Sequence, residues 1–151
     1  MLKINGLSLC WRQRLAGWYL LLLLVSLPLT AEKVIAPEDL TGVMRVTTQE
    51  VVNLILATPN LVIIDVRHRE NYAEGHIEGA KNHLDTLLDA AVLAGYLESK
   101  ETPVIFYCNG PDCLRSSHAA SLAYSLGYQR VYWYRDGWSG WLKERLPISY
   151  P

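Results

Sequence analysis

The stretch PVIFYCNGPDCLRSS, residues 103–117, decides the fold. It opens with an unbroken apolar and aromatic run at residues 104–107, which is typical of a strand buried on both faces in a parallel sheet. Cys108 follows, and the composition then changes to the turn-forming residues Asn-Gly-Pro-Asp. From Leu114 the apolar residues recur at helical spacing, and Gly127 is placed to end the helix. The stretch therefore predicts a strand, a tight loop and a helix.

Cys108 is a candidate nucleophile because of its place at the carboxyl end of the predicted strand. Ligands bind at that end in open α/β sheets, and a loop that runs into a helix N-terminus offers backbone N–H groups to an anion. We therefore expect Cys108 to form the reactive thiolate more readily than an ordinary cysteine. The alternative is a small core residue, because cysteine is among the residue types most often buried.

The composition describes one domain of ordinary charge. The chain has 151 residues, of which 50% are hydrophobic, and this is enough for a single core. Its formal net charge is −1, which gives no electrostatic basis for binding nucleic acid. Cys108, Cys113 and His118 are close in sequence, but no fourth ligand stands at a standard spacing, so we expect neither a metal nor a cofactor.

Residues 1–31 have the pattern of a targeting segment. Their charged residues are all basic, and an apolar run at residues 15–27 contains a block of consecutive leucines at residues 20–24. The run is short for a membrane span of ~20 residues, so the segment is predicted to be a cleaved signal peptide or an uncleaved N-terminal membrane anchor. Both readings predict a periplasmic or otherwise extracytoplasmic protein, which touches a membrane only through residues 15–31 if they are retained.

Residues 32–42 are predicted to be a tether, because a proline and a glycine interrupt them, and residues 43–151 to be the folded domain. Thr47 and Glu50 match a capping box that begins a helix, and Asp85 is placed to cap another. Further apolar runs at residues 61–64 and 130–134 indicate buried strands. Strands that alternate with helices predict an α/β fold with a small parallel sheet covered by helices on both faces.

Two groups of motifs stand in a characteristic order. The first is Asp65-Val66-Arg67 and then Gly75-His76-Ile77-Glu78-Gly79-Ala80. The second is the strand ending in Cys108, followed by Arg115-Ser116 and by Asp136-Gly137 with Trp141. Together they resemble the signatures of rhodanese-like domains over about residues 43–148, with Glu78 in place of the usual proline. The resemblance implies a sheet of about five strands.

The resemblance also implies a function and a site. Rhodanese-type sulfurtransferases use a thiolate to take a sulfane sulfur from a donor, hold it as a persulfide and pass it to a thiophilic acceptor. Cys108 would be the catalytic residue, and the partners would be a small sulfane-sulfur donor and a thiol acceptor, either a small molecule or a protein. The active-site loop and anion-binding groups would be Asn109, Gly110, Pro111, Asp112, Leu114, Arg115 and Ser116. A structural motif near the site would comprise Asp65, Arg67 and His76.

The loop departs from the family pattern in length and content. Six residues lie between Cys108 and Arg115, about two more than in typical active members. They include Asp112, which opposes an anionic donor, and a second thiol, Cys113. Gly110 and its neighbouring proline give the loop a bend and enough slack to bring Cys113 within disulfide distance of Cys108.

Three functions therefore stay open. The first is a sulfurtransferase or persulfide carrier that uses Cys108, with Cys113 as a resolving or regulatory thiol and their disulfide as a reversible off-state. The second is a thiol–disulfide redox module that uses both cysteines, which is chemically reasonable outside the cytoplasm. The third is a catalytically inactive rhodanese-like binding module. A phosphatase is disfavoured, because the loop has the wrong length for a phosphate cradle.

Overall fold

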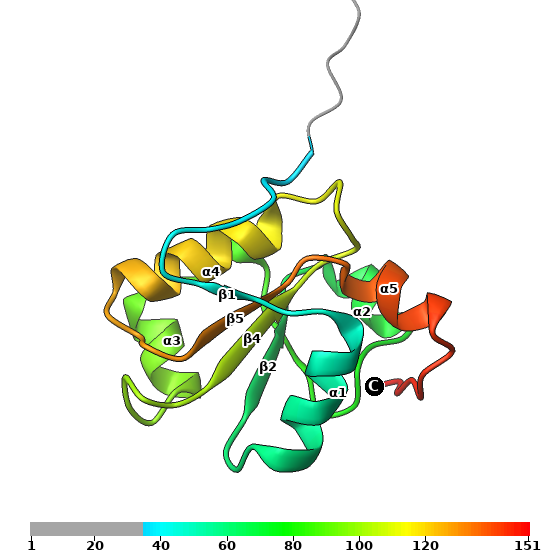
Figure 1. The fold of residues 1–151 in the computed structure, drawn as a ribbon, viewed down its shortest axis with the longest axis horizontal. Helices are drawn as coiled ribbons and strands as arrows, with labels where there is room; N and C mark the ends of the chain where they lie inside the picture. Colours follow the sequence, from blue (N-terminus) through cyan, green and yellow to red (C-terminus); the bar gives the residue numbers. More distant parts are fainter. Residues whose placement is uncertain (1–34) are drawn as a thin grey trace, which may run out of the picture. The chain divides into compact units, whose positions relative to one another are not determined.

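The computed structural model describes residues 35–151, which form a parallel sheet with helices on both faces (Figure 1). The five strands have the order β1-β5-β4-β2-β3, and every pairing between neighbours is parallel. The strands are β1 (Met44–Arg45), β2 (Val62–Asp65), β3 (Lys81–Asn82), β4 (Val104–Tyr107) and β5 (Val131–Tyr134). The helices are α1 (Thr48–Ala57), α2 (Arg69–Ala73), α3 (Ala90–Tyr96), α4 (Arg115–Ser125) and α5 (Gly137–Lys143), with a 3-10 turn, η1 (Asp85–Leu87). The predicted α/β fold is confirmed.

Strand β4 lies at the centre of the sheet, and all four of its residues are buried. Its side chains alternate between two apolar cores. Phe106 packs in one core with residues of α3 and α4, whereas Ile105 and Tyr107 pack in the other with residues of α1 and α5. Figure 1 shows α3 and α4 on one side of the sheet and α1 and α5 on the other. The central apolar run therefore forms a strand because both of its faces are covered.

The ends of two helices test the capping predictions. At α1 the predicted box is present: the Thr47 N–H donates to Glu50 Oε2 at 2.8 Å, and the Glu50 N–H donates to Thr47 Oγ1 at 3.4 Å. These bonds from Thr47 lower the pKa of Glu50. The prediction for Asp85 is wrong, because Asp89 caps α3 by accepting the Val92 N–H at 2.8 Å. Asp85 instead begins η1, which contacts α4.

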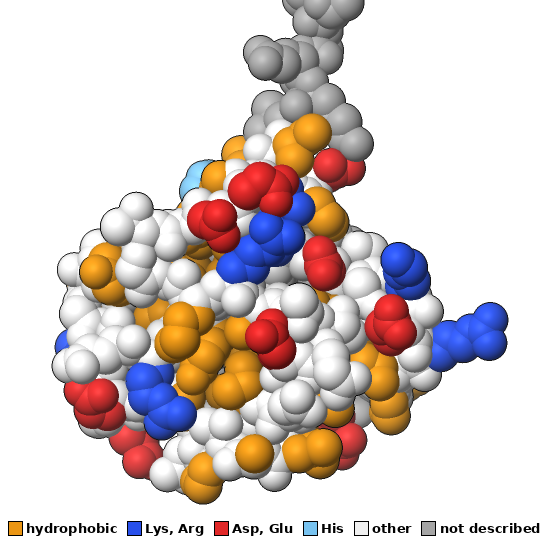
Figure 2. Space-filling view, in the orientation of Figure 1, with side chains coloured by type: hydrophobic (Ala, Val, Ile, Leu, Met, Phe, Trp, Pro, Cys, Tyr) orange, Lys and Arg blue, Asp and Glu red, His pale blue; other side chains and the backbone are white. Residues whose placement is uncertain are grey.

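Part of the predicted tether packs on the domain. Ala36 is buried, and its N–H donates to the Pro111 carbonyl at 2.9 Å. Arg135, which is 8% exposed, donates to the carbonyls of Ala36 and Pro37 at 3.0 and 2.8 Å. Acidic and basic side chains gather where the described chain begins (Figure 2), and Glu38 pairs with Arg135 at 2.9 Å. The segment is thus fixed beside the loop that contains Pro111.

The predicted signal peptide or anchor, residues 1–31, lies outside the described residues. Within residues 35–151, no helix is both long and apolar enough to cross a membrane. The export prediction therefore stays a prediction.

Candidate active site

Cys108 directly follows β4, and its side chain is enclosed, with 1% of its surface exposed. Its carbonyl accepts the Trp138 N–H at 2.8 Å, and the Asn109 carbonyl accepts the Ser139 N–H at 2.8 Å. These bonds fix the start of the loop on the first turn of α5. Gly137 permits the close approach: it has a φ of +54°, and a Cβ there would collide with the Cys108 carbonyl oxygen.

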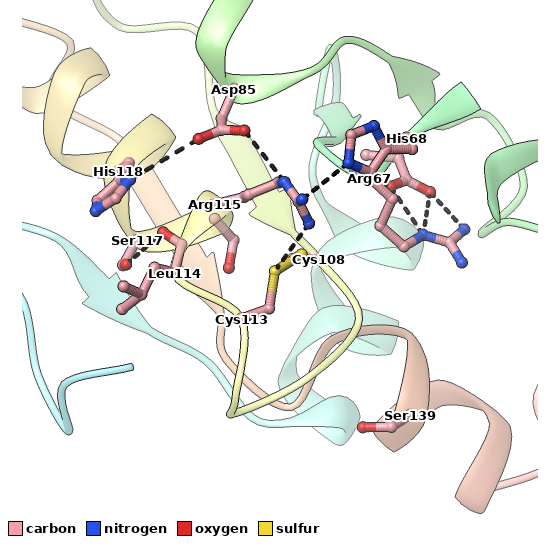
Figure 3. The surroundings of a disulfide bond; sticks show 12 residues. Arg67, His68, Asp85, Cys108, Cys113, Leu114, Arg115, Ser117, His118 and Ser139 are labelled. Carbon is pink, nitrogen blue, oxygen red and sulfur yellow. Dashed lines mark hydrogen bonds and ion pairs between the residues drawn. A yellow bond between two sulfur atoms is a disulfide. The ribbon is translucent and has the colours of Figure 1, made fainter. Parts of the chain in front are cut away.

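The loop after Cys108 folds back so that Cys113 reaches it. The Cys113 N–H donates to the Gly110 carbonyl at 3.0 Å, which closes a turn around Pro111. The sulfurs of Cys108 and Cys113 form a disulfide, and their Cα atoms are 6.3 Å apart (Figure 3). The expectation that the long loop brings the two cysteines together is confirmed. The structure therefore represents the oxidised state of the site.

Arg115, at the start of α4, points its guanidinium toward the disulfide (Figure 3). Its Nη1 lies 3.9 Å from Cys113 Sγ, and its Nη2 lies 2.9 Å from His68 Nε2. Arginine can only donate, so His68 Nε2 accepts in this contact. Asp85 lies on the other side, with Oδ1 at 3.6 Å from Arg115 Nε and Oδ2 at 3.8 Å from His118 Nδ1. The guanidinium is thus held between a histidine and a carboxylate.

A cleft of about 710 Å³ opens beside this group. Its walls come from the cysteine loop, η1, the start of α4 and α5. Cys113 lines it, whereas Cys108 does not. The lining residues are Asp85, Thr86, Asn109, Gly110, Pro111, Asp112, Cys113, Leu114, Arg115, His118 and Ser139. All of the predicted loop residues except Ser116 therefore face this cleft.

Ser116 has a different position from the predicted one. It is 1% exposed, and its hydroxyl accepts a hydrogen bond from the Trp133 indole Nε1 at 3.0 Å. The hydroxyl is therefore engaged in the core under α4 and is not available to an anion in the cleft. The reason is helical geometry, since consecutive residues at the start of a helix point about 100° apart.

The predicted motif of Asp65, Arg67 and His76 is structural. Asp65 and Arg67 are both buried, with Arg67 Nη2 at 2.6 Å from Asp65 Oδ2 and at 2.7 Å from the Gly75 carbonyl. The Tyr107 hydroxyl also donates to Asp65 at 2.6 Å, and burial together with this carboxylate raises the pKa of Tyr107. His76 stacks on a neighbouring tyrosine, and its backbone pairs with that of Ser149.

The Asp65–Arg67 pair reaches the cysteine loop through α5. The Arg67 guanidinium lies 4.7 Å from the centre of the Trp138 ring, and the backbone N–H of Trp138 donates to the Cys108 carbonyl. The pair thus joins the end of β2 to the helix that positions Cys108. Neither charged residue is among those that line the cleft.

The rhodanese-like domain family matches residues 47–144. The chain belongs to this family. It is 28% identical over 112 residues to the uncharacterized protein YibN of Escherichia coli, covering 74% of this chain and 76% of YibN. Among solved structures it is similar to the BH2092 protein of Bacillus halodurans, with a TM-score of 0.63, 25% identity, and coverage of 71% and 77% of the two chains. It also has the fold of a polysulfide-sulfur transferase homodimer from Wolinella succinogenes, with a TM-score of 0.59, 23% identity, and coverage of 73% and 80%.

Several groups at the site of this rhodanese-like domain were missed from the sequence. Asp85, Thr86, His118 and Ser139 line the cleft, and His68 contacts Arg115. Asp85 had a signal: it follows β3, whose carboxyl end lies at the same edge of the sheet as that of β4. Strand β3 has only two residues, so the strand itself was not recognised.

The cysteine–histidine spacing forms no metal centre in the described part of the rhodanese-like domain. There, no group of three or more His, Cys, Asp or Glu side chains is arranged to hold a metal ion. The sulfurs of Cys108 and Cys113 are bonded to each other, which occupies the groups that would serve as thiolate ligands.

Proposed function

We propose that this protein is a sulfurtransferase that carries a sulfane sulfur as a persulfide on Cys108, and that the disulfide to Cys113 is its resting off-state. The observation that carries the proposal is the position of Cys108, at the end of the central strand and at the base of a loop that enters α4. Membership of the rhodanese-like family and the fold shared with a polysulfide-sulfur transferase support it.

The chemistry begins after the disulfide is reduced. The Cys108 thiolate attacks the sulfane sulfur of the donor; the donor's S–S bond breaks, and the rest of the donor leaves with the electron pair. An acceptor thiolate then attacks the outer sulfur of the persulfide, takes it, and restores the Cys108 thiolate. Backbone N–H groups at the start of α4 stabilise the anionic persulfide.

The charges around the cleft favour a donor of low charge. Arg115 faces the disulfide, but Asp85 lies 3.6 Å from its Nε, and Asp112 also lines the cleft. The two carboxylates in the cleft lining oppose the binding of a dianion such as thiosulfate. We therefore expect an organic persulfide, whose reacting end carries at most one negative charge, to be a better donor than thiosulfate.

The test compares two serine variants in a sulfur-transfer assay to cyanide, with thiosulfate and an organic persulfide as donors. Cys108→Ser should lose all transfer, and should not gain the mass of one sulfur atom when incubated with donor. Cys113→Ser should keep transfer and no longer need prior reduction. Equal loss in both variants would contradict a persulfide carrier.

The disulfide itself favours a second candidate, a thiol–disulfide redox module, because both cysteines already participate in one bond. In that case the reduced protein would reduce a disulfide substrate, and each serine variant would lose that activity. Both candidates are compatible with export, which we propose from residues 1–31. Finding the full-length protein free in the cytoplasm after cell fractionation would contradict export.

A further inference from the structure

We propose that an external thiolate opens the Cys108–Cys113 disulfide by attacking Cys113, so that Cys113 is the sulfur that reacts with the reductant. Cys108 is then the leaving group and is released as a thiolate. This inference rests on the proposed function, because it names the partner chemistry that converts the off-state into the active carrier. Its chemical core, the choice of sulfur, can be measured without any sulfur transfer.

Access decides between the two sulfurs. A thiolate must approach the attacked sulfur from the side opposite the leaving sulfur, so the attacked atom needs open space in front of it. Cys113 is partly exposed and lines the cleft of about 710 Å³. Cys108 is 1% exposed and belongs to the apolar core that also contains Phe106 and Ala119. In the disulfide state, an external thiolate therefore has no open approach to Cys108.

Charge favours the same sulfur. The Arg115 Nη1 lies 3.9 Å from Cys113 Sγ, and it is fixed there by His68 and Asp85. The guanidinium beside the attacked sulfur attracts an incoming thiolate, whereas the Asp85 and Asp112 carboxylates in the cleft lining oppose any further negative charge on the thiol. The cleft also has the size of a small-molecule site, for which volumes of about 300–1,000 Å³ are usual, so a low-molecular-weight thiol can enter it.

The external thiol is the only reductant that this exchange needs. In the first step the thiolate RS⁻ bonds to Cys113 Sγ, the Cys108–Cys113 bond breaks, and Cys108 leaves with the electron pair. In the second step another RS⁻ attacks the sulfur of R in the mixed disulfide, which releases RSSR and the Cys113 thiolate. Two thiolates are oxidised to one disulfide, and the protein disulfide is reduced to two thiolates. The first step thus releases Cys108 as a thiolate, and the second step releases Cys113.

The experiment maps the first adduct. The oxidised full-length protein is mixed with glutathione, stopped with acid at short times, alkylated with N-ethylmaleimide and digested with trypsin. Fragmentation of the peptide 101–115, which holds both cysteines, locates each group. We expect glutathione on Cys113 and N-ethylmaleimide on Cys108, with at least a tenfold excess over the reverse pattern at the earliest times. Glutathione on Cys108, or an equal distribution, would overturn the proposal.

A second measurement tests the role of Arg115. The disulfide is opened with an anionic thiol, mercaptoethanesulfonate, and with a cationic thiol, cysteamine. In Arg115→Gln the ratio of the anionic to the cationic rate should fall severalfold, whereas Lys143→Gln, which removes an exposed basic charge on α5, should leave it unchanged. A general structural disturbance would slow both thiols alike, and an unchanged ratio in Arg115→Gln would refute the charge argument.

The two proposals can fail separately. Sulfur transfer is measured on protein that has been fully reduced beforehand, which does not depend on the sulfur at which the reductant enters. If reduced protein with an intact Cys108 forms no persulfide, the proposed function is refuted while the adduct pattern still stands. An adduct on Cys108 in a protein that transfers sulfur would refute this inference alone.

Discussion

The substitution Gly137→Ala should disturb the cysteine loop more than an alanine placed at a glycine of positive φ whose surroundings are open. Gly137 has a φ of +54°, and a Cβ there would overlap the Cys108 carbonyl oxygen and lie 3.0 Å from the carbonyl carbon. It would also lie 3.1 Å from the Gly110 nitrogen. These are backbone atoms of the loop, so no side chain can rotate away to make room.

The magnitude follows from two costs. A residue other than glycine at positive φ costs about 1–2 kcal/mol, and forcing an extra carbon into a packed site costs about 1–3 kcal/mol. Gly137→Ala should therefore lower the free energy of unfolding by about 3 kcal/mol. The matched control is Gly127→Ala, whose φ is +87° but whose Cβ would meet nothing within 4 Å. Only the first cost applies there, so we expect a loss of about 1 kcal/mol.

Urea unfolding followed by circular dichroism measures both values under oxidising conditions. The sulfur-transfer assay on reduced protein gives a second readout: Gly137→Ala moves the Cys108 backbone and should reduce transfer, whereas Gly127→Ala should not. The thermal midpoints should differ in the same order, by about 4 °C for each kcal/mol in a domain of this size. Equal destabilisation in the two variants would refute the reasoning, because the contact with the loop would then cost nothing.

Three further predictions concern stability. Reducing the disulfide, whose cysteines are five positions apart, should lower the free energy of unfolding by about 2 kcal/mol, while a Cys108→Ala/Cys113→Ala double variant should not respond to reductant. Tyr107→Phe removes a hydrogen bond to the buried Asp65 carboxylate and should lower the free energy of unfolding by about 1.5–3 kcal/mol. Tyr134→Phe removes a hydrogen bond to Thr48 and should lower it by about 0.5–1.5 kcal/mol. The reverse order would contradict the role of the buried Asp65 network. The lowered pKa of Glu50 means that its charged form stabilises the folded state. The difference in the free energy of unfolding between wild type and Glu50→Gln should therefore be complete above pH 4.5 and shrink as the pH falls through the pKa of Glu50 in the folded state. A difference that does not depend on pH would exclude this role.

The parts of the fold that the sequence predicted are those with a long or well-punctuated signal. Strands β2, β4 and β5 are apolar runs, and α1 has its capping box. Strands β1 and β3 have two residues each and no side-chain alternation that could reveal them. They exist because β5 and β2 offer free hydrogen-bonding edges, and that depends on the strand order, which no local pattern contains.

The residues of the site also differ in how strong a signal they leave in the sequence. Cys108, Cys113 and the loop residues were identified because glycine and proline indicate a turn and cysteine indicates a candidate nucleophile. The hydrogen bond from the Ala36 N–H to the Pro111 carbonyl joins two backbone groups, so neither side chain could predict it from the sequence. Asp85 was assigned to a helix cap because an aspartate before an apolar helical pattern fits a cap as well as it fits a binding site. Tertiary structure alone distinguishes these roles.

The anchoring of residues 36–38 has a practical consequence for anyone who shortens the chain. A protein trimmed to residues 43–151, as motif boundaries suggest, would lack Ala36, Pro37 and Glu38. Arg135 would then lose these acceptors, and the Pro111 carbonyl would lose its donor. Reduction potentials and rates measured on such a fragment would therefore describe a cysteine loop that is held less firmly than in the chain with residues 36–38. The shortest fragment that preserves the native loop therefore begins ahead of Ala36.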